Sequence, residues 1–375
     1  MAASMRLNNP ELQRKLEEVE NYTEDTIASI ARYYDETEEF PHEPMEYFFQ
    51  NDFFSLLTSN SEEDVTVFLE TIRIVSSKFA ALGSILLTQG FYAVVPLHQF
   101  GTDEQKAKYL PDLISGTSYG GFGLSEENDS GDPTYIHTLA VETPFGWVIN
   151  GNKKYISNAP LASVLLVAAR TKSLDGSDGT GIFIVETDRK GLTVTEPMEK
   201  TGITSLQVAS VQFQQIEVAH DALLGNTLEG VDQVTFTMNL MKLSVAMQAV
   251  GIAQGAFAKG LEHMSVVRKF GNRLIDNQST QEKMADMKTS IYSAEAFVRM
   301  VMTDTQNSIE VAMAKLLTAN IALEVTESII QLTGGYGFMK DSDIERYIRD
   351  AKVTSIYGGS SRSQRRMITE PWVNS

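Results

Sequence analysis

The sequence contains no cysteine. This absence excludes disulfide bonds, thiolate metal sites and cysteine nucleophiles, and it is typical of a protein from a reducing compartment. Histidine is scarce as well. Five histidines occur in 375 residues, and no two stand at the H-x-x-x-H spacing of a metal-binding helix. We therefore expect no metal site.

Positive charge is scarce relative to negative charge. The chain has 31 Lys and Arg against 49 Asp and Glu, which gives a formal net charge of −18. Because such a protein repels phosphate backbones, binding to nucleic acid is not expected. No run approaches the roughly eighteen uninterrupted apolar residues of a membrane helix. The first five residues show no basic stretch followed by an apolar core, so we expect a cytoplasmic protein without membrane association.

Three regions of the chain differ in their hydrophobic pattern, and 42% of all residues are hydrophobic. Helical spacing dominates first, short β-branched and aromatic runs between turn residues follow, and long helical patterns end the chain. This order predicts an α+β fold with an N-terminal α-helical domain (residues 1–116), a central small antiparallel β-domain (117–228) and a C-terminal four-helix bundle (229–375). The expected helices cover residues 12–33, 65–79, 104–113, 231–268, 280–305 and 308–332, with a last one from 360 or 361; strands are expected at 147–150, 163–168, 181–185 and 208–213.

Several motifs occur in a fixed order along the chain: Phe100–Pro111, Gly123–Asp132, Asn150–Asn158, Gln331–Gly337 and Ile356–Arg365. Together they resemble the acyl-CoA dehydrogenase superfamily from about position 97 to the C-terminus. The resemblance implies the acyl-CoA dehydrogenase fold, an FAD cofactor, an acyl thioester substrate and an electron-transfer flavoprotein as electron acceptor. It also implies assembly as a homotetramer or homodimer, because members of the family build each FAD site across a subunit interface.

By this resemblance, two strands meet the flavin ring. Phe122, Leu124 and Ser125 belong to the strand whose backbone and hydroxyl touch the ring. Tyr155 would lie against the ring, where the family often has tryptophan, and Ser157 would lie near N5. Periodicity alone offers a different interpretation, in which Phe122, Tyr155 and Ser157 are ordinary residues of a sheet core.

The resemblance assigns the adenosine and pyrophosphate contacts to a neighbouring subunit. Gln331, Gly334 and Gly335 match these contacts, since glycines let backbone N–H groups approach a phosphate closely. Considered alone, the glycines are only a helix stop. Ser360 matches the family's threonine at the start of the last helix. Arg362 adds positive charge where glutamine or glutamate is common.

Two further cofactor residues, Phe270 and Gln278, fall at the family's spacing. The arginine that usually stands three residues before the Phe-Gly pair is absent, because that position is Val267. Arg268 is adjacent, but one helical step rotates a side chain by about 100°. We expect FAD to bind, more weakly than is usual for the family.

The glutamate that the family uses as its base is missing. Removal of the α-proton requires a base within hydrogen-bond reach, and its two known positions are Gly358 and Met241 here. No Asp or Glu occurs between positions 232 and 262 or between 350 and 370. The base is therefore unassigned, with Tyr357, a residue of the N-terminal domain or a partner chain left as candidates.

Substrate binding residues are expected around the same positions. The N–H of Gly358 remains available for the thioester carbonyl, as half of an oxyanion-type site. Lys242 replaces the family's arginine, and Asn239 replaces an aspartate often seen near the substrate amide. The alternative for Asn239 and Lys242 is a solvated helix face.

Three functions are compatible with these residues. The first is α,β-oxidation of an acyl thioester, bound to CoA or to a carrier protein. The second is a flavin-dependent monooxygenase or oxidase of the same fold, which needs no α-proton base. The third is a catalytically silent subunit that forms a hetero-oligomer with an active homologue, which the missing glutamate and Val267 favour.

Overall fold

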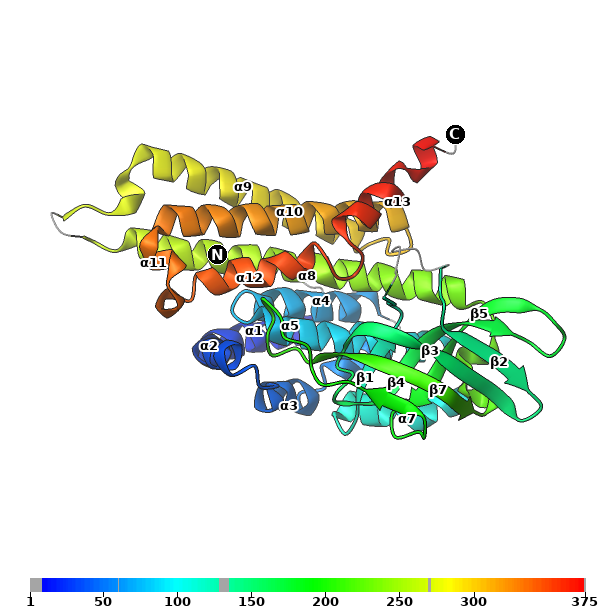
Figure 1. Ribbon diagram of the computed structural model, residues 1–375. Coiled ribbons are helices and arrows are strands. Elements are labelled where there is room, and N and C mark those ends of the chain that lie inside the picture. The colour runs from blue at the N-terminus through cyan, green and yellow to red at the C-terminus, as the bar shows by residue number, and fades with distance from the viewer. Residues whose placement is uncertain (1–8, 60, 128–134, 269–270, 374–375) are drawn as a thin grey trace.

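The computed structural model describes residues 9–59, 61–127, 135–268 and 271–373. Helices come first, a sheet follows, and a bundle of long helices ends the chain (Figure 1). The expected α+β order is confirmed. The expected domain limits at 116/117 and 228/229 fall in the connections before the first strand and before the first bundle helix.

The N-terminal domain consists of short helices whose starts are set by polar caps. Ser61 accepts a hydrogen bond from the Asp64 N–H at 3.3 Å, and Thr102 and Gln105 form a reciprocal capping box. The long helix expected at residues 12–33 is present as two α-helices joined by a π-helical segment. The elements are α1 (Pro10–Tyr22), a π segment (Thr23–Ile27), α2 (Ala28–Thr37), α3 (His42–Gln50), α4 (Glu62–Ser76), α5 (Ala80–Leu87), a second π segment (Thr88–Val94), α6 (Val95–Phe100) and α7 (Asp103–Ser115).

The central domain is one seven-stranded sheet with the order β1-β4-β2-β3-β7-β6, in which β5 also pairs with β4. The sheet is mixed, because β1 and β2 both pair with β4 in parallel. The expectation of a purely antiparallel sheet is wrong in this detail. The β2–β3 hairpin separates β1 from β4, so the chain enters both in the same direction. The strands are β1 (Tyr119–Gly123), β2 (Leu139–Thr143), β3 (Gly146–Ser157), β4 (Ala162–Lys172), β5 (Asp178–Glu186), β6 (Leu192–Val194) and β7 (Val208–Val218).

The C-terminal domain is built on three long helices that lie alongside one another (Figure 1). These helices and the last one begin within two residues of their expected starts. A further helix, α12, covers residues for which only a motif was noted. The helices are α8 (Gly230–Ser265), α9 (Gln278–Val301), α10 (Ser308–Thr333), α11 (Gly335–Phe338), α12 (Glu345–Thr354) and α13 (Ser361–Val373).

Helix α8 is the central element of the core that joins the N-terminal helices to the bundle. A Cβ on Gly255 would lie 1.9 Å from the carbonyl oxygen of Ser77, and one on Gly251 would lie 2.2 Å from that of Arg73. Glycine is therefore required where α8 approaches α4 backbone to backbone. Two stretches, Ala80–Phe100 and Gly230–Ser265, are long and apolar enough to cross a membrane, but 100% and 89% of their most apolar windows are buried inside the protein.

Candidate functional site

The residues expected to meet a flavin ring start at the end of β1. Phe122 is buried and pairs with Leu166 of β4, while Leu124 and Ser125 are half-buried in the loop that follows. The Ser125 carbonyl accepts a hydrogen bond of 2.8 Å from the Lys154 N–H. This bond fixes the loop against β3 and leaves the Ser125 hydroxyl without an assigned partner among the described residues.

Sequence reasoning missed the ion pair that fixes this loop. The Nζ of Lys153, whose side chain is fully buried, lies 2.9 Å from Glu126 Oε1 and donates to the Leu124 carbonyl at 3.0 Å. Glu126 also accepts from the N–H and the hydroxyl of Thr138. Burial raises the pKa of Glu126, but the charge and hydrogen bond of Lys153 and the bonds of Thr138 outweigh it and lower the pKa to about 2. The sequence offered one signal for this pair: a lysine within the Asn150–Asn158 motif and a glutamate within the Gly123–Asp132 motif.

Tyr155 and Ser157 lie on β3 beside this loop. The register of β3 against β7 shifts between Lys153 and Ile156, and Tyr155 has a φ of +60°. A bulge of this kind redirects side chains, and it leaves Tyr155 60% exposed. Tyr155 is therefore not a sheet-core residue, whereas Phe122 is buried. An exposed aromatic ring with a half-buried hydroxyl at Ser157 forms a surface that suits a planar ring system.

The residues expected to meet the adenosine and pyrophosphate lie at the end of the bundle where α10 is followed by α11. Gln331 lies in the last turn of α10, and Gly334 and Gly335 follow the helix; all three are exposed. A Cβ on either glycine would meet no atom within 4 Å, so the surface over them is open. Gln278 begins α9 and donates to Glu282. Phe270 lies outside the described residues.

Arg268 lies at this same end of the bundle, where it contacts one ring of an aromatic stack. Its Nη2 lies 2.6 Å from Nε2 of His263, and the His263 ring stacks on Tyr336 with centroids 4.0 Å apart. Burial and then the Arg268 charge lower the pKa of His263. Through His263 the guanidinium is thus linked to Tyr336, which follows Gly335 in the chain, although Val267 holds the family's arginine position.

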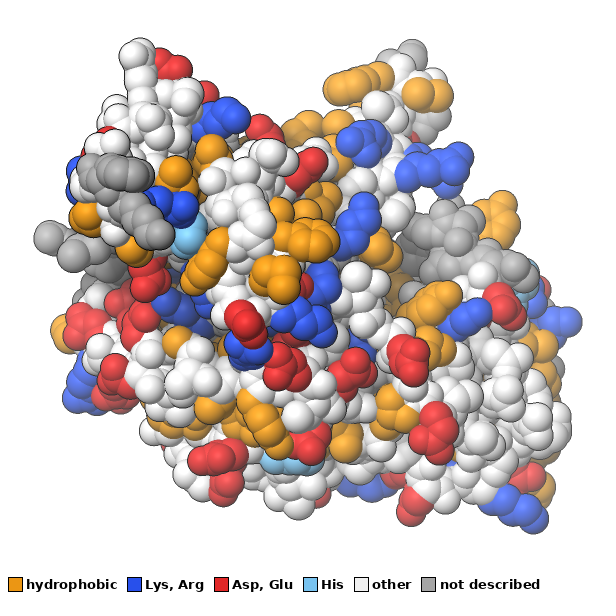
Figure 2. All heavy atoms as spheres, turned by 60° about the vertical axis from the view of Figure 1, so that its left-hand side comes forward, with side chains coloured by type: hydrophobic (Ala, Val, Ile, Leu, Met, Phe, Trp, Pro, Cys, Tyr) orange, Lys and Arg blue, Asp and Glu red, His pale blue; other side chains and the backbone are white. Residues whose placement is uncertain are grey.

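The two groups of expected cofactor residues are far apart on one chain. The strands β1 and β3 lie at one end of the molecule, and α11 with the α8–α9 connection lies at the opposite end (Figure 1). Figure 2 brings the α11 end forward and shows hydrophobic and basic side chains interspersed over its upper half. The exposed hydrophobic residues at this end are Val266, Val267, Tyr336, Phe338 and Met339.

The two vacant base positions face each other. Gly358 has a φ of +63°, and a Cβ built on it would lie 3.3 Å from Val245 Cγ2 and 3.9 Å from the carbonyl oxygen of Met241. The loop after α12 thus places Gly358 directly over the turn of α8 that carries Met241. No hydrogen bond from the Gly358 N–H to a described residue is present.

Two buried lysines occupy this region. Lys242 is 4% exposed, and Lys315, on α10, is fully buried. The Lys315 amine donates to the Gly359 carbonyl, while the Lys242 amine lies 3.6 Å from the sulfur of Met367 on α13. Burial lowers the pKa of Lys242 to about 8, and burial together with the Lys242 charge lowers the pKa of Lys315 to about 7. The solvated helix face considered for Lys242 is therefore wrong.

Tyr357, one of the candidates for the base, is held in a hydrogen-bonded network. Its hydroxyl donates to Gln248 Oε1 and lies 3.5 Å from the hydroxyl of Ser84. Gln248 in turn donates to Ser84 at 2.7 Å. Burial raises the pKa of Tyr357 above its usual range. A phenol with a raised pKa stays protonated at neutral pH and cannot accept a proton, so Tyr357 is better suited to fixing the loop that carries Gly358.

Asn239 lies at the floor of a cavity of about 480 Å³ beside α8. The amide is 3% exposed and donates to the Thr305 carbonyl at 3.2 Å and the Ser308 hydroxyl at 2.9 Å. Its Oδ1 and the Oε1 of Gln233 are buried without a hydrogen-bond partner among the described residues. Asn239 is therefore not on a solvated helix face. Unpaired acceptors in a cavity suit a ligand that brings N–H donors.

The last expected cofactor residues lie at the start of α13. Ser360 accepts a hydrogen bond of 3.2 Å from the Ser363 N–H, so it caps this helix. Arg362 is exposed in the first turn.

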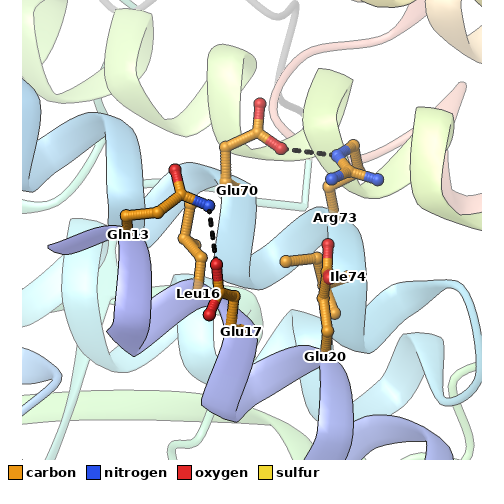
Figure 3. A pocket seen from close by; sticks show the side chains of 7 residues that line it. All are labelled: Gln13, Leu16, Glu17, Glu20, Glu70, Arg73 and Ile74. Carbon is orange, nitrogen blue, oxygen red and sulfur yellow. Dashed lines mark hydrogen bonds and ion pairs between the residues drawn. The ribbon is translucent and has the colours of Figure 1, made fainter. Parts of the chain in front are cut away.

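A second cavity, of about 120 Å³, lies between α1 and α4, where Glu70 and Arg73 form an ion pair of 2.6 Å (Figure 3). Arg299 also pairs with Glu70 at 2.8 Å, so this buried network links helices.

The whole described fold matches known domain families. The N-terminal, middle and C-terminal domains of acyl-CoA dehydrogenases match residues 9–117, 121–216 and 229–371. The chain belongs to the acyl-CoA dehydrogenase family. It is 32% identical to the short-chain specific acyl-CoA dehydrogenase of Clostridium acetobutylicum over 367 residues, which cover 96% of each protein.

Solved structures of acyl-CoA dehydrogenases have the same fold. Butyryl-CoA dehydrogenase from Megasphaera elsdenii superposes with a TM-score of 0.90 at 28% identity, over 99% of this chain and 100% of that one. A glutaryl-CoA dehydrogenase from Mycobacterium smegmatis, described in complex with FADH2, has a TM-score of 0.90 at 20% identity, over 100% and 97%. An identity of 20% shows a shared fold.

Proposed function

We propose that this protein is an FAD-dependent oxidoreductase that forms a C=C bond between the α and β carbons of an acyl thioester. The observation that carries the proposal is the Gly358 loop over α8, with an N–H that has no partner among the described residues. An N–H at this place can bind the thioester carbonyl oxygen as negative charge develops on it. FAD, when bound, accepts the β-hydrogen as hydride.

The described residues fit a flavin. Tyr155, exposed on its bulge, offers an aromatic surface, and the hydroxyls of Ser125 and Ser157 are donors beside it. The open glycines at 334 and 335, together with Arg268, suit a pyrophosphate. The first group would hold the ring, and the second would hold the pyrophosphate of a flavin bound mainly by a neighbouring chain.

The cavity at Asn239 is the proposed entrance for the carrier arm of the thioester. A pantetheine arm carries amide N–H donors, which match the unpaired acceptors of Asn239 and Gln233. Glu229 and Asp232 also line the cavity. These carboxylates repel phosphates placed at the same point, so the phosphates of CoA, or of an arm attached to a carrier protein, would lie outside the cavity.

Assembly and electron transfer complete the proposal. Because the two groups of cofactor residues lie at opposite ends of one chain, at least two chains are needed to enclose one FAD, as a homodimer or homotetramer. The reducing equivalents would then pass to an electron-transfer flavoprotein, as the family resemblance implies. We also expect the protein to work in the cytoplasm.

Anaerobic titration of the flavin-loaded protein with a panel of acyl-CoA thioesters tests this proposal. We expect loss of the oxidised-flavin absorption with at least one thioester, and no loss with the corresponding free acids. Thioesters that bind tightly, as measured by calorimetry, without reducing the flavin would contradict the proposal.

The silent-subunit function is a second candidate, because Val267 and Gly358 remove two of the family's functional side chains from this chain. That function requires a glutamate-bearing homologue as partner. Purification of the tagged chain from its natural source, with identification of co-purifying chains, discriminates the two. A homologue recovered in equal amount supports the silent subunit, and recovery of the chain alone supports the enzyme.

A further inference from the structure

Lys242 and Lys315 share one buried volume with the Gly358–Gly359 turn. Lys315 donates to the Gly359 carbonyl, and the only acceptor that the described residues offer the Lys242 amine is the sulfur of Met367, at 3.6 Å. A thioether is a weak acceptor. Among the described residues, no oxygen holds the Lys242 amine, so it can accept a new partner from a ligand.

The stretches of α8, α10 and the C-terminal segment that surround this pair lack carboxylates, and the acids of α9, which packs on α8 and α10, are Glu282, Asp286 and Glu295. Residues 233–261 of α8, 311–323 of α10 and 351–369 contain no Asp or Glu, and all of them are described. The other charged groups on α13 are the cations Arg362, Arg365 and Arg366 and, near its C-terminal end, the exposed Glu370. Tyr357 and, next to it, Tyr92 are further titratable groups near the pair. Two ammonium groups in such surroundings repel each other.

The consequence is that the pair of amines carries one proton less than two full charges near physiological pH. Burial lowers the pKa of Lys242 to about 8, and burial with the Lys242 charge lowers that of Lys315 to about 7. Because the two groups interact, the first proton lost belongs to the pair. A free amine thus exists beside the place where the family keeps its carboxylate.

Lys242 is also placed to reach a substrate. It follows Asn239 by three positions on α8, so both side chains lie on one face of the helix, one turn apart. Asn239 lines the cavity of about 480 Å³. Lys242 lies one turn further along α8, with its amine beside Met367 of α13 and close enough for its charge to act on Lys315, which binds the Gly359 carbonyl. An acyl thioester that enters past Asn239 would bring its α-carbon toward this amine.

The other buried groups that could act as a base are already engaged in ion pairs or hydrogen bonds. The four buried carboxylates of the described residues are Glu70, Glu126, Glu295 and Asp350, and each lies within 4 Å of an arginine or lysine nitrogen. The Tyr357 phenol has a raised pKa and donates to Gln248. Neither a buried acid nor this phenol is available for the α-proton.

We propose that the side-chain amine of Lys242 accepts the α-proton of the acyl thioester, in place of the glutamate of the family. In this step the α C–H bond breaks and an N–H bond forms on Nζ. The electron pair stays on the thioester as an enolate, whose oxygen accepts from the Gly358 N–H. Lys315 is a positioning residue, which holds the turn through Gly359 and keeps one amine of the pair unprotonated. The inference rests on the proposed function, because it assigns the base of that reaction.

Exchange of the α-protons of phenylacetyl-CoA in D2O isolates this step. The compound has no β-hydrogen, so it cannot be oxidised across the α and β carbons, and its α-proton signal is followed by NMR. We expect the flavin-loaded protein to catalyse the exchange, faster as the pH rises through about 7 to 8. Lys242→Met and Lys242→Arg should each lose about 100-fold or more, the typical contribution of a general base.

Lys315→Met tests the positioning role through the pH dependence of the exchange rate, which a purely structural role of Lys315 would leave unchanged. In this variant Lys242 titrates alone, with a pKa of about 8 set by burial, instead of sharing the first proton loss of the pair near 7, so the rising limb of the exchange rate should shift to higher pH. Lys283→Met, at an exposed lysine of α9, is the matched control and should exchange at the wild-type rate. Circular dichroism and flavin content establish that each variant is folded, and Lys242→Arg serves if the methionine variant is not.

Wild-type exchange rates in folded Lys242→Met or Lys242→Arg overturn the assignment, even if other thioesters reduce the flavin. An exchange rate in the wild type that falls with rising pH also overturns it, because it indicates an ammonium acting as an acid. If no acyl thioester binds, as measured by calorimetry, the proposed function and this inference fail together. If thioesters bind and reduce the flavin while exchange is independent of Lys242, the base assignment alone fails.

Discussion

At the scale of single residues, the side chains that border the proposed flavin site are held by a bulge and by pairs between distant positions of the chain. Tyr155 is exposed because of a bulge in β3, and no alternation pattern reveals a bulge. The Lys153–Glu126 pair joins residues 27 apart, and the Lys315–Gly359 bond joins residues 44 apart. Such pairings depend on tertiary packing, so sequence periodicity could not show them.

Loss of the Lys153 charge should destabilise the loop that carries Ser125. Lys153→Met leaves the buried Glu126 carboxylate without its cation, and breaking a buried pair in this way costs about 3–5 kcal/mol. Urea denaturation measures the free energy of unfolding. Lys172→Met, an exposed lysine at the end of β4, is the control and should change it by less than about 0.5 kcal/mol.

The same carboxylate gives stability a defined pH dependence. The pKa of Glu126 is lowered from 4.5 to about 2 in the folded protein, so its contribution is present above pH 4.5 and is lost as the pH falls toward 2. Unfolding free energies measured across this range should fall more steeply in the wild type than in Glu126→Gln. Parallel curves for the two proteins would contradict the role given to the pair.

Tyr357→Phe tests the tyrosine separately from the base. Removing the hydroxyl leaves the Gln248 carbonyl oxygen unpaired, which should cost about 1–3 kcal/mol of stability. Flavin reduction at saturating thioester should persist within about tenfold, because the loss of a general base typically costs 10²-fold or more. Complete loss of reduction in a folded variant would identify Tyr357 as the base instead.

At the scale of elements, helices and their starts followed from periodicity and capping residues, whereas the connections between elements did not. The chain enters β4 parallel to β1 because a hairpin intervenes, and hydrophobic alternation does not encode strand direction. Gly358 was recognised as a vacant base position. Its positive φ and its place over Met241 emerged only from the packing of the loop on α8.

The backbone at Gly358 makes this position a poor one for a restored side chain. A residue with a side chain at position 358 has to adopt the left-handed backbone conformation, at a cost of about 1–2 kcal/mol. Its Cβ would also lie 3.3 Å from Val245 Cγ2. Gly358→Ala should therefore destabilise the protein more than Gly176→Ala, where φ is also positive but no atom lies within 4 Å. Equal shifts in the melting temperature would show that the Val245 contact is relaxed at no cost.

Helix α8 offers the better position for a carboxylate. Met241→Glu keeps helical backbone and places an acid beneath Gly358, so it should supply a carboxylate base whose pKa lies below that of the lysine pair. The rising limb of the flavin reduction rate should move to lower pH. Met247→Glu, at a fully buried position of α8, controls for burial of an acid and should show no such shift.

At the scale of the whole molecule, the three-domain order was predictable because the hydrophobic period changes from helical to strand-like and back to helical along the chain. The wide separation of the two groups of cofactor residues was suggested by the resemblance and is visible only in the fold (Figure 1). One end of the chain holds Tyr155 and Ser157, and the other holds Arg268 and Gly335. A single chain would therefore contribute the ring-binding half of one FAD site and the pyrophosphate-binding half of another.

This arrangement predicts that flavin binding depends on protein concentration. Dilution below the dissociation constant of the assembly should release FAD, which is followed by the rise of free flavin fluorescence and by light scattering of the same samples. Arg268→Ala should release flavin at higher protein concentration than the wild type. Flavin that stays bound to a monomer would contradict the shared site.

The central claim is that this acyl-CoA dehydrogenase family member uses a base that is not a carboxylate. The most direct test is the anaerobic, single-turnover rate of flavin reduction by its best thioester as a function of pH. We predict a rate that rises with pH through about 7 to 8, because an amine must lose its proton before it acts as a base. A rate that is flat from about pH 5.5 to about pH 9 would indicate a carboxylate base and would contradict the account.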